Sequence, residues 1–163
     1  MPGVTVYIRR EFKGINCPSQ KIKKLVRAVC RRFNLKIVLV SIAVVDNKQI
    51  RKLNERFLRR KKNTDCLSFD LSQPKVFPKW FDIIVNGQLA KSEAAKRHHS
   101  AQAELALYIT HGLLHNLGFD DHSISKAKIM HRLEDKILQQ QGFGRVYESK
   151  NITGTNKRHK NAD

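Results

Sequence analysis

The stretch "KIVLVSIAVVD", residues 36–46, decides the fold class of this 163-residue chain. Within it, residues 37–45 are apolar and rich in β-branched side chains, with Ser41 as the one interruption. A run of this kind is typical of a strand that is covered on both faces of its sheet. It is also far shorter than the ~20 apolar residues that span a bilayer. We therefore expect a strand inside a sheet packed with helices, and no membrane segment.

Two elements are expected before this strand. Residues 4–9 alternate between apolar and polar positions and predict a first strand. Ser19, which follows a proline, is expected to cap a helix over about residues 20–34. The apolar residues that recur on one face of this helix are Ile22, Leu25, Val26, Val29 and Phe33.

A helix and two short strands are expected after it. Asp46 followed by Gln49 resembles a capping box, which predicts the start of a helix. The buried stripe of that helix is expected to be Ile50, Leu53 and Phe57. Residues 66–71 and 82–86 predict two strands, and the two prolines of residues 72–80 indicate a loop between them.

The C-terminal half has a helical pattern. Residues 87–118 predict two helices with a break near residues 97–100, and Gly118 is a suitable left-handed cap for the second. A last helix is expected from Ser123 or Ser125 to about Gly142. Its apolar residues are Ile129, Leu133, Ile137 and Leu138.

The order of these elements predicts an α+β fold. We expect residues 1–149 to form a single domain, in which a mixed sheet of about four strands packs with about five helices. Residues 150–163 are polar and basic without periodicity, and we expect them to be a disordered tail. The sequence carries no signal for an oligomeric state.

The charge of the chain indicates a polyanionic partner. There are 32 basic and 14 acidic residues, a formal net charge of +18. Four of the basic residues and one acid lie in residues 150–163, which leaves 28 against 13 and a net charge of +15 for residues 1–149. A body this basic favours nucleic acid, because its cations release the counterions of the phosphate backbone.

The cysteines indicate a reducing compartment. Cys17, Cys30 and Cys66 are odd in number and widely spaced, which argues against a disulfide framework and against a cysteine-based zinc site. The N-terminal residues 1–12 contain no apolar signal core. We therefore expect a cytoplasmic protein with no disulfide partner.

Three histidines in "HGLLHNLGFDDH", residues 111–122, indicate a metal site. His111 and His115 are one helical turn apart, so both imidazoles leave the same face of the helix. Gly118 ends the helix, and the returning chain can bring His122 to the same point. Three protein ligands and an open fourth position are typical of catalytic rather than structural zinc. The site is thus expected at the C-terminal end of a buried helix.

Gly112 argues against one class of zinc enzyme. A peptidase with the HExxH motif needs a glutamate at this position as its general base. Glycine inside a helix costs about 1 kcal/mol relative to alanine. Its presence indicates a close approach to the helix backbone, either by something bulky or by a neighbouring strand or helix.

Glu104 lies seven residues before His111 on the same helical face. It could orient a ligand imidazole or neutralise a nearby cation, and the alternative is an exposed carboxylate. The other histidines are interpreted as surface residues: His98, His99, His131 and His159.

Three stretches in matching order resemble the YbeY family of metal-dependent endoribonucleases of ribosomal RNA maturation. "HGLLHNLGFDDH" is similar to the family signature HGxLHLxGYDH, residues 53–70 are similar to its LNxxYR segment followed by TDVLSF, and residues 81–86 are similar to its GDIxI strand. The resemblance covers roughly residues 36–140 and implies that His111 and His115 are metal ligands.

The sequence departs from the family pattern at two functional positions. The last histidine of the signature falls on Asp121, and His122 comes one residue later. We expect His122 to be the third ligand, with Asp121 as the alternative. Leu58 occupies the position of the family's phosphate-facing arginine, and Arg59 is the nearest replacement.

The function expected from the residues and the resemblance together is that of a zinc-dependent endoribonuclease. One zinc ion would activate the nucleophile and polarise the phosphodiester, and residues 59–62 would hold the flanking phosphates of single-stranded RNA. The expected partners are ribosomal RNA and the small ribosomal subunit, in RNA maturation and ribosome quality control. The alternative is an RNA-binding or assembly factor of the ribosome with a structural metal site. Either water or the ribose 2′-hydroxyl can be the nucleophile.

Overall fold

The expected central strand is β2 (Val38–Val45), which lies inside a four-stranded sheet of order β1-β2-β4-β3. The computed structural model describes residues 3–144 and 146–147, and the expected tail over residues 150–163 lies outside the described residues. β1 (Val4–Arg10) and β4 (Lys79–Asn86) run parallel to β2 on its two sides. β3 (Cys66–Asp70) pairs antiparallel with β4, so the prediction of a mixed sheet is confirmed.

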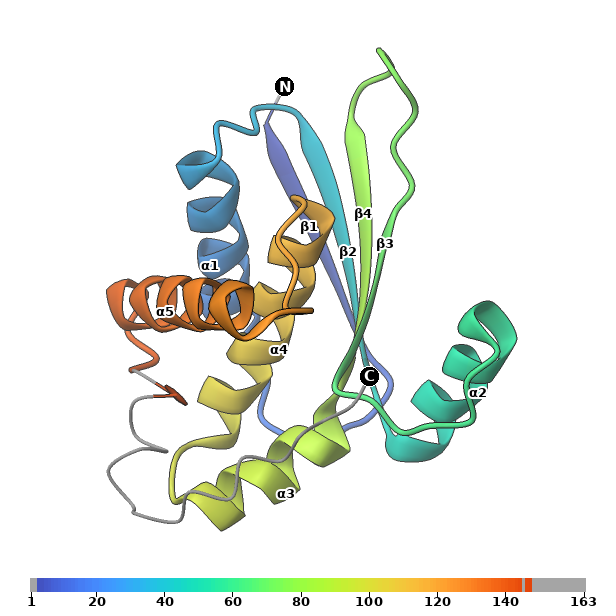
Figure 1. Cartoon of the computed structure of the whole chain (residues 1–163), viewed down its shortest axis with the longest axis vertical. Coiled ribbons are helices and arrows are strands. Elements are labelled where there is room, and N and C mark those ends of the chain that lie inside the picture. Colours follow the sequence, from blue (N-terminus) through green and yellow to red (C-terminus); the bar gives the residue numbers. More distant parts are fainter. Residues whose placement is uncertain (1–2, 145, 148–163) are drawn as a thin grey trace.

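The five expected helices are present. They are α1 (Ser19–Arg32), α2 (Asn47–Leu58), α3 (Gly87–Arg97), α4 (Ala101–Asn116) and α5 (Ile124–Gln140). Figure 1 shows α1, α4 and α5 on one side of the sheet and α2 on the other. The α+β prediction is therefore confirmed, and α4 is the helix that lies between the sheet and α5.

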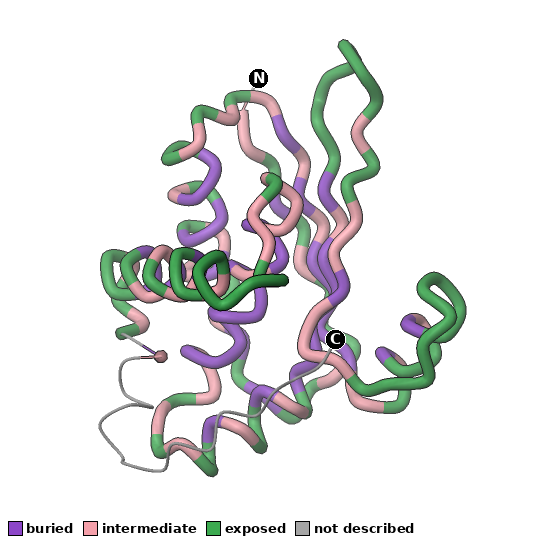
Figure 2. The backbone as a smooth tube through the Cα atoms, viewed as in Figure 1, coloured by how far each residue is buried: buried purple, intermediate pink, exposed green. Residues whose placement is uncertain are grey.

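The core explains why β2 is apolar at almost every position. Val40, Ile42 and Val44 belong to the main cluster, which also contains the buried residues of α1 and α4. Ala43 and Val45 face the other way, into a smaller cluster that α2 completes with Ile50. Figure 2 shows this buried centre of the sheet, with exposed segments at the tip of the β3–β4 hairpin and on α2.

Some local expectations at the helices are wrong. Ser19 does not cap α1, because Pro18 occupies the N-cap and no side chain bonds to the helix start. Phe57, which was expected in the buried stripe of α2, is 54% exposed. The capping prediction at α2 is confirmed for Asp46, whose Oδ1 accepts from the backbone N–H of Gln49 at 2.8 Å.

Cys17, Cys30 and Cys66 are free cysteines in the structure, and the first two are buried. Among the described helices, none has the length and apolar character needed to cross a bilayer.

Candidate metal centre

A serine cap and a glycine turn define the two ends of α4, the helix that carries His111 and His115. At the start of α4, Ser100 Oγ accepts from the N–H of Ala103 at 3.0 Å. At its end, Gly118 adopts the left-handed φ of +97° that was expected. The N–H of Phe119 then donates to Leu114 O at 3.0 Å, which reverses the chain directly after the helix.

Gly112 brings α4 close to the sheet. A Cβ at this position would lie 2.7 Å from Cys66 Sγ and 3.1 Å from Ile83 Cγ2. These side chains come from β3 and β4, so the close approach is made by neighbouring strands. The contact places the histidine face of α4 beside the edge strand β3.

The imidazoles of His111 and His115 meet edge to face, with ring centroids 4.4 Å apart. Their Nε2 atoms are 2.9 Å apart. The Nδ1 of His111 lies 3.3 Å from Glu134 Oε1, and the Nδ1 of His115 lies 3.0 Å from the carbonyl oxygen of Phe119. Both Nδ1 positions therefore face acceptors and carry the proton in the neutral ring.

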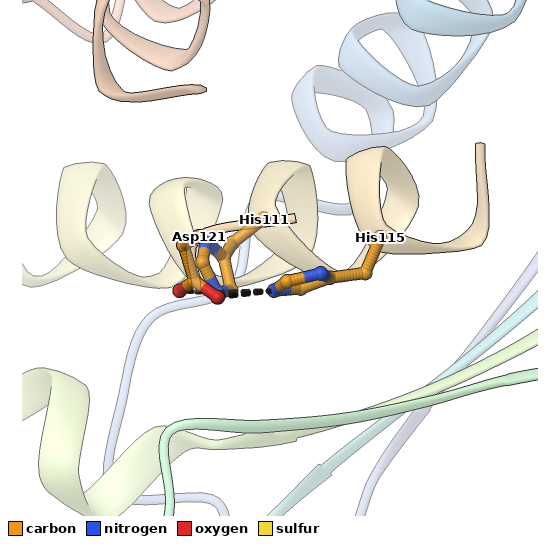
Figure 3. Close-up of side chains that lie close together, drawn as sticks. All are labelled: His111, His115 and Asp121. Atoms are coloured by element: carbon orange, nitrogen blue, oxygen red, sulfur yellow. Dashed lines mark hydrogen bonds and ion pairs between the residues drawn. The ribbon is translucent and has the colours of Figure 1, made fainter. Parts of the chain in front are cut away.

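This tautomer leaves a lone pair on each Nε2, and the two lone pairs point at one another. Two acceptors at this distance repel unless a cation or a proton lies between them. The carboxylate of Asp121 completes the group, with Oδ2 3.8 Å from the Nε2 of His111 and Oδ1 3.9 Å from that of His115 (Figure 3). The edges of a tetrahedral zinc site are about 3.3 Å. The three side chains are therefore placed so that they could hold a metal ion.

The structure does not bring His122 into this group, although it was the expected third ligand. In the part of the chain that the structure describes, the one group of three or more potential ligands within 4.8 Å of one another is His111, His115 and Asp121. In the turn, the N–H of His122 donates to Asp120 Oδ1 at 3.2 Å, and the side chain of His122 is exposed outside the group. The alternative third ligand, Asp121, is therefore the one that the geometry favours.

Glu134 is the acid that hydrogen-bonds a ligand imidazole, and the sequence reasoning missed it. It is fully buried on α5. Burial raises the pKa of its carboxyl, against the lowering effect of its hydrogen bond to His111. Burial alone would lower the pKa of His111, but the hydrogen bond and the charge of Glu134 raise it to about 9. The signal in the sequence is a glutamate on the apolar stripe of α5, between Met130 and Leu138.

His115 responds in the opposite direction. Burial and the positive charge of His111 lower its pKa, and the charge of Asp121 opposes them. Asp65 is the residue before β3. Its negative charge acts to raise the pKa of both histidines. Sequence reasoning missed Asp65 as well. The site is thus a place where several carboxylates favour a cation.

Glu104 has a different environment from the one expected for an acid that orients His111. It is fully buried and accepts from Arg97 at 2.9 Å and from the ring of His99 at 2.5 Å. Glu104 therefore neutralises a cation at the start of α4. The interpretation of His99 as a surface residue is wrong, because its side chain is only 14% exposed.

Arg59 and Leu58 lie at the end of α2, and both are exposed. Arg59 has a left-handed φ of 54° and closes the helix through its N–H, which donates to Glu55 O at 3.0 Å. Its guanidinium makes no hydrogen bond or ion pair with the described residues. Asn54 anchors the basic segment 59–62, because its buried amide donates to Lys62 O at 3.0 Å.

Comparison with known proteins gives a consistent result. A sequence profile described as "Endoribonuclease YbeY" matches residues 7–142. A protein of that name from Carboxydothermus hydrogenoformans is 36% identical over 107 residues, which are 66% of this chain and 75% of that protein. Another from Francisella philomiragia subsp. philomiragia is 28% identical over 137 residues, 80% of this chain and 87% of that protein. A solution structure of a Thermotoga maritima protein shares the fold, with a TM-score of 0.55 and 22% identity over 83% of this chain and 91% of that one.

Proposed function

The chain belongs to the Endoribonuclease YbeY family and is an RNA-cleaving hydrolase, and we propose that its cleavage depends on one zinc ion. We further propose that it prefers single-stranded RNA and acts on ribosomal RNA, in maturation and in ribosome quality control. The small ribosomal subunit is the proposed partner, and the cytoplasm the proposed location. The observation that carries the metal dependence is the convergence of two histidine lone pairs and one carboxylate at the end of α4.

The proposed ligands are His111, His115 and Asp121. Two histidines and one carboxylate form a ligand set of known zinc hydrolases, and three protein ligands leave a position open for the substrate or water. His122 stays a second candidate for the third position only if the turn at residues 119–123 rearranges. When bound, zinc supplies Lewis acidity to a phosphoryl oxygen and lowers the pKa of water to about 7.

The residues around the metal centre orient its ligands. Glu134 and the carbonyl of Phe119 hold the two Nδ1 protons, so that each Nε2 is the free donor atom. Residues 59–62 carry four consecutive cations and precede Asp65 by a few residues. We propose that this segment holds the phosphates that flank the scissile bond, with Arg59 in the role that the family gives to its arginine.

A second candidate function keeps the metal but removes the reaction. The same three side chains connect α4 to its return loop, so a metal ion bound there could stabilise the chain reversal alone. The protein would then be an RNA-binding or assembly factor of the ribosome. Metal removal distinguishes the two functions. Loss of a catalytic metal abolishes cleavage while the domain stays folded, whereas loss of a structural metal unfolds the domain.

The decisive experiment compares His115→Ala with the wild type on a ribosomal RNA fragment. His122→Ala is the matched control, because it removes the same type of side chain seven residues further on. We expect His115→Ala to lose both bound zinc and cleavage, and His122→Ala to keep both. Equal cleavage by all three proteins would show a contaminating nuclease and refute the proposed function.

The product ends identify the nucleophile. A 2′,3′-cyclic phosphate shows attack by the neighbouring ribose hydroxyl, whereas direct attack by water forms no cyclic product. Mass spectrometry of the cleaved fragment distinguishes the two results.

A further inference from the structure

The segment between Glu11 and Asp46 contains no acidic residue. It contains eight basic ones: Lys13, Lys21, Lys23, Lys24, Arg27, Arg31, Arg32 and Lys36. This segment includes all of α1. A large share of the basic excess of the chain is therefore concentrated on one helix and its flanks.

On α1, these basic residues lie away from the buried face of the helix. Its inner face is fully buried against the sheet and α4, through Ile22, Leu25, Val26, Val29 and Cys30. Lys24, Arg27 and Arg31 are exposed, and Lys36 is exposed just beyond the helix. We call these four residues the α1 cationic face.

The α1 cationic face is concave at one end. A shallow, open hollow of about 340 Å³ lies there, and its lining includes Arg27, Arg31, Asn34 and Lys36. Asn34 is in the left-handed region with φ of 58°, which turns the chain so that Lys36 lies on the same side as the two arginines. Three cations therefore surround one hollow.

No carboxylate neutralises these cations. In residues 3–144 and 146–147, the side chains of Arg27, Arg31 and Lys36 form no ion pair or hydrogen bond. Other cations of the protein do have acidic partners, such as Arg97 with Glu104 and Lys126 with Asp120. Unpaired positive charge around a hollow attracts an anionic partner.

The C-terminal end of α1 contacts the loop of the metal centre. The rings of Phe33 and Phe119 pack edge to face at 5.5 Å. The carbonyl oxygen of Phe119 is the partner of His115 Nδ1 at 3.0 Å. A ligand bound along the C-terminal part of α1 thus lies beside the metal loop.

We propose that the α1 cationic face is a second RNA-binding surface. It binds phosphates of the substrate at nucleotides that are not next to the scissile bond. It is separate from residues 59–62, which follow α2 on the other side of the sheet (Figure 1). The inference rests on the proposed function for the identity of the substrate. The contacts are made to phosphates, so this surface gives affinity and register without reading the base sequence.

An acidic protein is a weaker candidate for the partner. Protein interfaces have a core of apolar and aromatic side chains, whereas a phosphate backbone needs only cations. The exposed large apolar residues of the described chain include none from α1; they are Tyr7, Phe57, Leu58, Leu71, Val76, Phe77, Trp80, Ile124 and Ile129.

The test measures how RNA binding depends on salt. Full-length wild type is compared with Arg27→Gln/Arg31→Gln/Lys36→Gln, using a fluorescent single-stranded RNA in the presence of EDTA so that no metal-dependent cleavage occurs. Each lost phosphate contact lowers the slope of log K against log salt by about 0.7. We expect the slope to fall by about 2 and the Kd at 0.1 M salt to rise on the order of 10–100-fold.

The matched control is Lys48→Gln/Arg51→Gln/Lys52→Gln, which removes three exposed charges from α2. It should keep the wild-type slope. Equal changes in both triple variants would mean that only net charge matters, and an unchanged slope in the α1 variant would mean that RNA does not bind there; either result overturns the proposal. Binding of polyglutamate as tight as that of RNA, and lost in the same variant, would overturn the assignment to RNA.

Cleavage, measured separately with zinc, keeps this proposal distinct from the proposed function. If the wild type does not cleave RNA while the α1 variant shows the reduced slope, the surface stands and the enzymatic function fails. If the wild type cleaves and the slopes are equal, the function stands and the surface is wrong.

Discussion

The Nδ1 of His111 lies 3.3 Å from Oε1 of Glu134, a carboxylate that is fully buried. This pair joins the two helices α4 and α5 and holds one candidate metal ligand in a fixed tautomer. A buried carboxylate next to a metal ligand is stabilised by the positive charge that it faces, whether that charge is a proton on His111 or a metal ion.

Glu134→Gln should therefore weaken zinc binding. The amide keeps the shape of the side chain but not its charge, and loss of such an orienting carboxylate typically costs 10–100-fold in metal affinity. Competition with a chelator of known affinity measures the change. The exposed acid Glu55→Gln is the control, and equal affinities in both variants would show that Glu134 does not act on the site.

Zinc affinity should depend steeply on pH. Zinc must displace the proton of His111, whose pKa is raised to about 9. Between pH 7 and 9, one displaced proton makes the apparent affinity rise about tenfold per pH unit. Chelator competition at pH 7.0 and 8.5 measures this slope, and a flat profile would mean that His111 is neutral before zinc binds.

The stability of the metal-free protein should fall as the pH rises, whereas the zinc affinity should increase. His111 has a pKa near 9 in the folded state and 6.5 as its ordinary value, so its proton stabilises the fold fully below pH 6.5. That contribution is lost as the pH rises from 6.5 to 9. Thermal unfolding in EDTA should thus show a falling Tm over this window, while zinc-loaded protein shows none. A Tm in EDTA that rises over this window would contradict the charge assigned to His111.

Asp121→Ala should remove zinc, whereas His122→Ala should retain it. The carboxylate of Asp121 lies within 4 Å of both histidine nitrogens, and His122 is exposed outside the group. Metal content after dialysis gives the answer directly. The reverse result would show that the turn rearranges when metal binds and would restore the ligand first expected.

Gly112→Ala should destabilise the fold although alanine is the better helix former. The new Cβ would lie 2.7 Å from Cys66 Sγ, and overpacking of this kind costs about 1–3 kcal/mol, against a gain of about 1 kcal/mol in helix propensity. Urea unfolding measures the difference. Cys66→Ala/Gly112→Ala removes the clashing sulfur and should recover part of the loss; no recovery would place the strain elsewhere.

Elements with a strong local pattern were predictable from the sequence. The apolar run of β2 and the helix pattern ending at Gly118 gave both the sheet and the position of His111 and His115. The predicted burial of Phe57 is wrong because it depends on where α2 packs, which no local pattern contains. Phe57 has the spacing of a buried residue, but its ring only packs edge to face with that of Phe69 at 5.6 Å and stays half exposed.

The details of the metal centre depend on contacts distant in sequence. Glu134 reaches His111 across 23 residues, so its role follows from the docking of α5 and not from any motif. The choice between Asp121 and His122 depends on the conformation of the turn, in which the N–H of His122 donates to the side chain of Asp120. Spacing alone leaves both residues within reach.

The position of Glu134 on the last helix also sets when the metal centre can form. The chain is synthesised from its N-terminus, so α4 with both histidines is complete before α5 has been synthesised. Until α5 docks, His111 lacks the carboxylate that fixes its tautomer. A chain that ends before α5 would therefore hold His111 and His115 without the carboxylate that orients His111.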